Sequence, residues 1–281
     1  MEMTAAGPDK QKATESARFP FGRNWASFLG VLTDARIEEA ERSLEQMMGA
    51  GRLAGATFLD AGSGSGLFSL AAMRLGARRV HSFDFDPESV ACARELKRRY
   101  FPDAGNWTIE QGSVLDPDYM NRVGHWDIVY SWGVLHHTGR MWEGLAQVIS
   151  HVEQRGLLFI SIYNDQGPTS TGWRFVKRLY NTNVVGKAGV LSVFVPYFVL
   201  RGLAVDLIRR RTPTARYREY RRTRGMSLIH DWKDWLGGYP FEVATPEEVF
   251  EFCRRRGFAL EKLITCGGRL GCNQFVFTRH P

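Results

Sequence analysis

The chain has 281 residues, of which 44% are hydrophobic and 24% are charged, and it carries a net charge of +7. These values predict a soluble globular protein that forms one large α/β domain, or one domain with a sizeable insertion, and they leave room for an anionic partner or surface. The four cysteines form no CxxC pair and have no zinc-like histidine spacing, so we expect reduced thiols and no metal site.

The N-terminal residues 1–17 are polar and contain no apolar core. This composition argues against a secretory signal or a transit peptide and predicts a disordered arm. We therefore expect a cytoplasmic protein. A helix-like stretch follows at 25–32, and Asp34 is expected to cap a second, amphipathic helix that ends near 49–51.

Strand and helix signals then alternate along the chain. This alternation predicts crossover units on a parallel sheet. The expected strands are 57–60, 79–84, 107–111, 126–131 and 156–163, with helices at 67–75, 87–100 and 139–154. After a long insertion at 166–240, a capping signature opens a helix at 245–256, and 258–265 and 275–279 form two closing strands.

A glycine-rich segment follows the first expected strand, in the run Phe58-Leu59-Asp60-Ala61-Gly62-Ser63-Gly64-Ser65-Gly66. The second strand ends at Asp84. Glycines allow a ligand to approach the backbone closely, and an acid after the next strand bonds ribose hydroxyls, so the pattern predicts a nucleoside pocket. A dinucleotide fingerprint would require its third glycine at position 67, where this chain has leucine.

The resulting pattern, D-x-G-x-G-x-G, resembles motif I of the class I S-adenosylmethionine (SAM) methyltransferases. The resemblance extends from about 19 to 279 and is strongest to small-molecule enzymes such as the ubiquinone-pathway O-methyltransferases. It implies a Rossmann-like α/β fold with a seven-stranded sheet, mostly parallel with the last strand antiparallel, and a helical insertion after strand 5. It also implies SAM as cofactor, S-adenosylhomocysteine as product and no metal.

The same resemblance assigns the cofactor site. Asp60 would help to hold the methionine amine, and Asp84 would accept the ribose hydroxyls. The run 111–116 matches the adenine-edge loop, with Ser113 where most relatives carry an acid. The expected cofactor-binding residues are Asp60, Gly62, Ser63, Gly64, Gly66, Asp84, Phe85, Ser113, Val114, Ser131 and Trp132. The aromatic and basic run 21–25 is either a lid over the cofactor or the start of a helix.

Methyl transfer is an in-line displacement that needs a base only when the nucleophile arrives protonated. Ligands of open α/β sheets bind at the carboxyl ends of the strands, which directs attention to the residues after strands 4 and 5. We expect His137, Tyr163 and Asp165 to be catalytic. The expected substrate contacts are Asn164, His230, Asp231, Tyr239 and Glu242. Helix capping and turn chemistry are the structural alternatives for these residues.

The insertion contains an apolar run at 190–200, broken by Pro196, and then eight arginines between 209 and 224. A membrane span needs about 20 apolar residues, and this run is shorter. Two interpretations stay open: a helical cap over the active site with a solvated basic face, or an interfacial segment on an anionic bilayer.

The predicted activity is transfer of a methyl group from SAM to a small molecule, at a hydroxyl oxygen of an aromatic or lipid-like acceptor. N-methylation of a small molecule and RNA methylation through the arginine-rich stretch are the alternatives. We expect no nucleic-acid partner, because the Asn/Asp-Pro-Pro-aromatic motif of base methylation is replaced by Ser131-Trp132-Gly133-Val134. A nicotinamide oxidoreductase conflicts with the glycine spacing, and a SAM-binding protein without activity is the remaining rival.

Four segments follow from this interpretation. They are an arm at 1–17, N-terminal helices with the SAM-binding core at 18–165, a helical substrate cap at 166–240, and the closing helix and strands at 241–281. The expected location is the cytoplasm, with peripheral contact to an anionic membrane as an open alternative. The acceptor and the oligomeric state stay undetermined.

Overall fold

The structure is a computed structural model, in which residues 22, 29–30, 32–208, 212, 232 and 235–280 are described. The chain divides into two compact units. The sheet unit comprises Pro20–Gln166 and Glu242–Pro281, and the helical unit comprises Met1–Phe19 and Gly167–Phe241. The expected arm at 1–17 and most of the expected helix at 25–32 lie outside the described residues.

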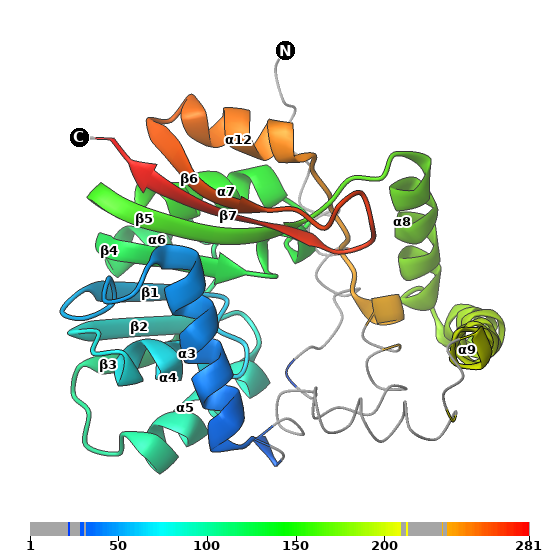
Figure 1. The fold of residues 1–281 in the computed structure, drawn as a ribbon, viewed down its shortest axis with the longest axis horizontal. Coiled ribbons are helices and arrows are strands. Elements are labelled where there is room, and N and C mark those ends of the chain that lie inside the picture. Colours follow the sequence, from blue (N-terminus) through cyan, green and yellow to red (C-terminus); the bar gives the residue numbers. More distant parts are fainter. Residues whose placement is uncertain are drawn as a thin grey trace. The chain divides into compact units, whose positions relative to one another are not determined.

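The sheet unit is built on a seven-stranded sheet with the order β3-β2-β1-β4-β5-β7-β6 (Figure 1). Strands β1 to β5 are parallel to one another, and β7 is antiparallel to both β5 and β6. The predicted fold, with its antiparallel last strand, is therefore confirmed. The strands are β1 (Thr57–Ala61), β2 (Arg79–Asp84), β3 (Trp107–Gln111), β4 (Trp126–Trp132), β5 (Val152–Tyr163), β6 (Phe258–Ile264) and β7 (Cys272–Arg279).

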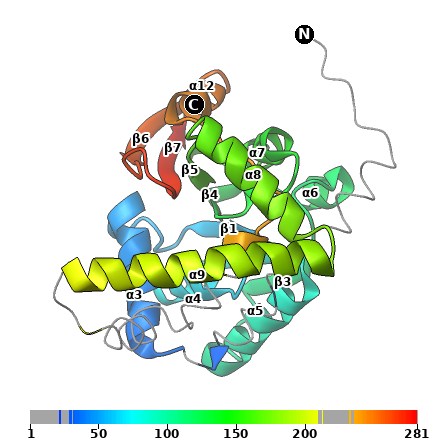
Figure 2. The same cartoon turned by 90° about the vertical axis from the view of Figure 1, so that its right-hand side faces the viewer.

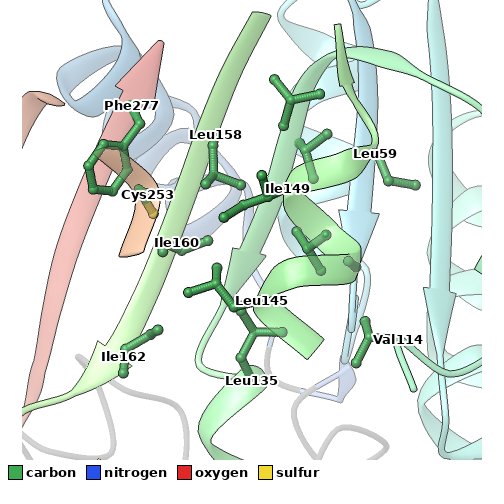
Figure 3. Close-up of a cluster of buried hydrophobic side chains, with 14 of the residues drawn as sticks. Leu59, Val114, Leu135, Leu145, Ile149, Leu158, Ile160, Ile162, Cys253 and Phe277 are labelled. Carbon is green, nitrogen blue, oxygen red and sulfur yellow. The ribbon is translucent and has the colours of Figure 1, made fainter. Parts of the chain in front are cut away.

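Helices cover both faces of this sheet. Successive residues of a strand point to opposite faces, so Phe58 of β1 packs in one hydrophobic core and Leu59 in the other. The first core is completed by α3 (Asp34–Met48), α4 (Leu67–Arg74) and α5 (Pro87–Tyr100). The second core is completed by α6 (Pro117–Val123), α7 (Met141–Ser150) and α12 (Pro246–Arg254). Figure 3 shows the second core, where Leu145 and Ile149 of α7 lie against β5.

Helix termini follow their capping residues. The capping box predicted at Thr245 is present, because Thr245 Oγ1 accepts a hydrogen bond from Glu248 N and Glu248 Oε2 accepts one from Thr245 N. Asp34 was expected to cap α3, but the N-cap residue is Thr33 and Asp34 is the first helical residue. Helix α6 was missed, although Asp116 caps it and Pro117 occupies its first position, which is a recognisable start signal.

The boundary between α7 and β5 differs from the expected one. The helix was expected to run to 154 and the strand to begin at 156, but α7 ends at Ser150 and β5 begins at Val152. The first part of β5 is polar and exposed and contains Arg155 at φ 62°. The β4–β5 register shifts in the same region. An irregular, solvated strand end carries no apolar run, so its sequence does not distinguish it from the end of a helix.

The helical unit contains α8 (Pro168–Tyr180) and α9 (Val184–Ile208). The expected break at Pro196 is wrong, because α9 continues through this residue as one helix of 25 residues (Figure 2). Pro196 is exposed, so water can hydrate the carbonyl group that loses its helical partner. By length and composition α9 could cross a membrane, and it is the one helix in the described part of the chain that meets this criterion.

Lys177 of α8 is completely buried in the helical unit. Its Nζ donates a hydrogen bond to the carbonyl oxygen of Trp235 and lies 4.1 Å from the centroid of the Trp235 ring and 5.0 Å from that of Phe241. Among the residues that the structure describes, no carboxylate forms an ion pair with it. Burial therefore lowers the pKa of Lys177 to about 7.

The buried lysine predicts a pH-dependent stability of the helical unit. Between about pH 7 and pH 10 the unfolded chain keeps the Lys177 proton and the folded chain loses it, so the free energy of unfolding rises with pH in this window. Denaturant unfolding followed by tryptophan fluorescence should show this gain, on the order of 4 kcal/mol, relative to a Lys177→Met variant. The exposed Lys187→Met should keep the wild-type profile. Identical profiles for wild type and Lys177→Met would contradict the effect.

Candidate cofactor and acceptor site

The loop after β1 is fixed to the end of β2 by backbone hydrogen bonds. The N–H groups of Gly62 and Ser63 both donate to the carbonyl oxygen of Phe83, at 2.9 and 3.0 Å. Gly62, Gly64 and Gly66 have φ values of 84°, 52° and 80°, which lie in the left-handed region that favours glycine. The spacing that predicted a tight nucleoside loop thus corresponds to left-handed backbone at three alternate positions.

Two of these glycines also lie where a side chain would overlap with a neighbour. A Cβ atom at Gly62 would lie 2.9 Å from Cβ of Val134 and closer still to its methyl groups. A Cβ atom at Gly66 would lie 2.8 Å from Cβ of Ala93. The loop therefore packs against the segment after β4 on one side and against α5 on the other.

Asp84 at the end of β2 organises the same loop. Its Oδ2 accepts a hydrogen bond from Gly64 N, and its Oδ1 accepts one from Asp86 N, each at 2.9 Å. These two bonds fix the carboxylate at the carboxyl edge of the sheet, and each oxygen has a further lone pair for a ligand hydroxyl. The position agrees with the predicted ribose contact.

Asp86 connects the N-terminal segment to this edge. Its Oδ1 caps α5 by accepting a hydrogen bond from Glu88 N, and its Oδ2 accepts one from Gly22 N at 2.8 Å. Gly22 is the one described residue of the run 21–25, which was considered as a lid. Its contact lies two residues from Asp84. Phe85, between the two acids, is 48% exposed.

Asp60 is a buried carboxylate in β1. Its Oδ2 accepts a hydrogen bond from Ser69 Oγ at 2.5 Å, and burial raises its pKa to about 7, with a smaller contribution from the charge of Asp84. Two nearby oxygens, Oγ of Ser63 in the loop and Oη of Tyr130, are buried without a hydrogen-bond partner among the described residues.

The predicted adenine-edge residues differ in their surroundings. Ser113 Oγ accepts a hydrogen bond from Leu115 N at 3.1 Å, so its hydroxyl shapes the turn before α6. Val114 is buried in the second core, as Figure 3 shows, beside Gly144 of α7. The contact of either residue with an adenine ring stays a prediction.

The end of β4 presents one buried and one exposed side chain. Ser131 is buried, and its Oγ donates to the carbonyl oxygen of Ala61 at 2.9 Å, which joins β4 to the loop-bearing strand β1. Trp132 is 43% exposed, and its Nε1 donates to Oε1 of Gln274 in β7 at 3.3 Å. An exposed indole at this edge could stack against a sulfonium cation.

Three aromatic rings gather where β4 and β5 end. His136 and His137 form a short 3₁₀ helix, and the ring of Tyr163 at the end of β5 lies 3.9 Å from His136 and 5.5 Å from His137, centroid to centroid. Buried His136 accepts a hydrogen bond at Nδ1 from Tyr163 N, at 3.3 Å. The residues predicted for the site did not include His136, and the pair of adjacent histidines after β4 was the available signal for this cluster.

The other predicted residues divide into three groups. Asn164 and Asp165 lie at the sheet edge, where Asn164 Oδ1 accepts a hydrogen bond from Asn273 Nδ2 and Asp165 N donates to the carbonyl oxygen of Ala244. Glu242 holds the start of α7, because its Oε2 accepts from Met141 N at 3.0 Å and its own N–H donates to the carbonyl oxygen of His136 at 2.9 Å. Tyr239 is half-buried in the helical unit, and His230 and Asp231 lie outside the described residues.

The residues at this edge fit SAM as a ligand. The left-handed glycine loop allows close backbone approach, and the carboxylate of Asp84 lies where the ribose contact was predicted. Buried Asp60 is a carboxylate without a paired cation among the described residues, which suits a positively charged amine. The unpartnered hydroxyl of Ser63 offers a further polar contact. Among the described residues no group of three or more histidine, cysteine or acidic side chains could hold a metal.

Comparison with known proteins shows which proteins the chain is similar to. Residues 59–158 match the family profile described as a methyltransferase domain. The fold is similar to that of magnesium protoporphyrin IX methyltransferase from Synechocystis PCC 6803 with bound SAM, with a TM-score of 0.56 and 12% identity over 99% of this chain and 100% of that chain. An O-methyltransferase family protein from Burkholderia thailandensis has a TM-score of 0.51 and 14% identity over 88% and 58% of the two chains.

Shorter stretches are similar to ribosomal protein L11 methyltransferases. The match in Tolumonas auensis is 32% identical over 117 residues, 41% of this chain and 37% of the relative. The match in Anoxybacillus flavithermus is 43% identical over 63 residues, 22% and 20% of the two chains. The chain thus spans well under two thirds of these relatives. Residues 59–158 thus match a methyltransferase domain, and the fold of the chain is similar to that of a methyltransferase with bound SAM.

The glycine geometry predicts the effect of a single methyl group. Gly62→Ala should lower the free energy of unfolding by about 1–3 kcal/mol and weaken SAM binding, because alanine is strained at φ 84° and overlaps with Val134. The double variant Gly62→Ala/Val134→Ala lacks the methyl groups that overlap with the new side chain. It should therefore recover the part of the lost free energy of unfolding that comes from this overlap. The control Gly105→Ala, where a Cβ meets nothing within 4 Å, should match wild type. Urea unfolding and calorimetric titration with SAM measure both effects, and an unchanged Gly62→Ala would refute the assignment.

Proposed function

We propose that this protein transfers the methyl group of SAM to a small-molecule acceptor, at a hydroxyl oxygen of an aromatic or lipid-like compound. The observation that carries this proposal is the cluster of His137 and Tyr163 at the carboxyl ends of β4 and β5, next to exposed Trp132. Aromatic rings with polar tips can enclose a planar or apolar acceptor while directing one hydroxyl. The helical unit is proposed to contribute acceptor recognition, and the cytoplasm is the proposed location.

Bound SAM supplies a methyl group already activated on a sulfonium. The chain then has to bind, align and desolvate the two reactants. Asp84 and the Gly62–Gly66 loop would hold the nucleoside part, and Asp60 would face the amine. Trp132 would shield the sulfonium side of the pocket, since aromatic faces attract cations.

His137 is the proposed base for the acceptor hydroxyl. The neighbouring His136 is buried and accepts a backbone hydrogen bond from Tyr163 at Nδ1, so its role is to hold the 3₁₀ helix against β5. His137 is half-buried on the same short helix, where an imidazole can take a proton from a bound hydroxyl. Tyr163 and Asp165 are proposed to orient the acceptor.

A protein acceptor is the second candidate, favoured by the sequence matches to ribosomal protein L11 methyltransferases. Those matches cover 37% of the relative or less, which supports a shared cofactor half rather than a shared acceptor site. N-methylation of a small molecule and RNA methylation are further alternatives. Assays with phenolic or lipid-like hydroxyl compounds, amines, ribosomal protein L11 and RNA in parallel, using radiolabelled methyl groups, distinguish the four.

Asp84 provides the test of the cofactor site. Asp84→Ala should weaken binding of S-adenosylhomocysteine by about a hundredfold, because two hydrogen bonds to a charged group are lost. An analogue of S-adenosylhomocysteine without ribose hydroxyls should bind the wild-type protein poorly. The Asp84→Ala variant should bind this analogue and S-adenosylhomocysteine with equal affinity. Asp118→Ala, an exposed acid of α6, serves as the control. Near-unchanged affinity of Asp84→Ala in calorimetry would contradict the pocket.

His137 provides the test of the base. His137→Ala should lower kcat by roughly 10²–10⁴-fold with SAM affinity unchanged, and added imidazole should restore part of the activity. His125→Ala is the matched control, since His125 is exposed and precedes the opposite, amino end of β4. A His137→Ala variant with full turnover, or one that loses SAM binding as well, would exclude His137 as a base.

A further inference from the structure

Helix α9 exposes a continuous apolar face that the proposed methyl transfer does not explain. Five large side chains on it are between 40% and 80% exposed, and they are Val185, Val193, Leu200, Leu203 and Leu207. With Gly189 and Pro196 they recur at steps of three or four residues. A helix turns once every 3.6 residues, so these positions share one face, and none of them is charged.

The opposite face of α9 belongs to the interior of the helical unit. Val190 is buried, and the rings of Phe194 and Phe198 lie 5.3 Å from those of Trp173 and Trp232, respectively, centroid to centroid. The cationic residues of the helix, Lys187 and Arg201, lie three residues before Val190 and three residues after Phe198. They therefore share the packed face of the helix. One face of α9 therefore packs in the helical unit, and the opposite face is apolar, uncharged and exposed. Soluble proteins expose large contiguous apolar patches mainly at interaction sites.

The charge of the adjoining sequence indicates what this face meets. Residues 209–224, which directly follow α9, contain eight arginines and one glutamate, a net charge of +7. The whole chain also has a net charge of +7, so all other residues together are neutral. The positive excess of the protein is thus concentrated in the sequence that directly follows its exposed apolar helix. An apolar face next to a polybasic segment complements a bilayer of anionic lipids.

The position of the charges on α9 distinguishes a helix that lies on the membrane from one that crosses it. Lys187 and Arg201 leave an uncharged stretch at 188–200, which spans roughly 20 Å at 1.5 Å per residue. The hydrocarbon core of a bilayer is about 30 Å thick. A crossing helix would place one of these cations inside it, whereas a helix in the plane of the interface keeps both on its anchored side.

We propose that α9 docks onto an anionic membrane surface, with its outward face at the boundary of headgroups and acyl chains. The protein is then a peripheral one. This docking does not depend on the identity of the methyl acceptor, because it uses a face of α9 and none of the residues of the candidate cofactor and acceptor site.

Vesicle flotation of the full-length protein tests the proposal. The protein should bind vesicles of phosphatidylcholine mixed with phosphatidylglycerol at least about tenfold more tightly than vesicles of phosphatidylcholine alone. Raising the ionic strength from about 0.1 M to about 1 M should remove most of this preference, since the Debye length shortens to roughly 3 Å. Absence of binding, or equal binding to both vesicles, would overturn the proposal.

Substitutions on the outward face test whether vesicle binding requires α9 itself or only the positive charge of the chain. Leu200→Glu and Val193→Glu should each weaken binding to the anionic vesicles about tenfold, and both should keep SAM affinity, because the replaced side chains are exposed. Ile264→Glu, a matched change at an exposed apolar residue of β6, should bind as wild type does. Wild-type binding by both α9 variants would exclude the helix as the docking element.

Two further measurements distinguish the proposed docking from a helix that crosses the bilayer and from a contact with a second copy of the chain. Extraction of the vesicle-bound protein with alkaline carbonate should release it, and retention would show a helix that crosses the bilayer. Light scattering should give the same mass for wild type and Leu200→Glu. A dimer that Leu200→Glu converts to a monomer, with vesicle binding unchanged, would assign the face to a second copy of the chain and overturn the proposal.

Discussion

The geometry of the cofactor edge depends on the hydrogen bonds that join the β1 loop to the end of β2. The carbonyl oxygen of Phe83 accepts two loop N–H groups, and the carboxylate of Asp84 accepts a third from Gly64. Each bond requires the chain to turn back sharply after β1, which only left-handed residues allow. The glycines are therefore necessary for the loop to reach β2, and Asp84 has a structural role even before it meets a ribose.

The acceptor side of the sheet edge is connected to this loop through β4. Ser131 binds the last carbonyl group of β1, and Val134 contacts Gly62, so the position of the 3₁₀ helix of His136 and His137 follows from that of the loop. Glu242 then links the same helix to the start of α7. The predicted cofactor and acceptor positions are thus joined by one continuous set of contacts, which would suit a reaction that depends on alignment of two reactants.

The sequence was sufficient to predict the sheet, because crossover strands are buried on both faces, as β1 is, and alternate with helix patterns. It was sufficient for the glycine loop and Asp84, because their spacing is a direct consequence of backbone geometry. It was insufficient for His136, whose role depends on a backbone N–H of β5 that is distant in sequence. It was wrong about Pro196, because a proline is tolerated where the helix surface is solvated, and exposure is a property of the tertiary structure.

Two of the buried ionisable groups with strongly shifted pKa values, Lys177 and Asp60, show how differently the two units use charge. Lys177 lies among aromatic rings and a single carbonyl oxygen, so burial favours its neutral form and the helical unit stays internally apolar. Asp60 lies in a rigid strand beside Asp84, and burial raises its pKa to about 7. A cation that arrives next to Asp60 would favour the ionised form and offset part of the desolvation cost. The ionised carboxylate is therefore unfavourable by itself, and a positively charged ligand would stabilise it.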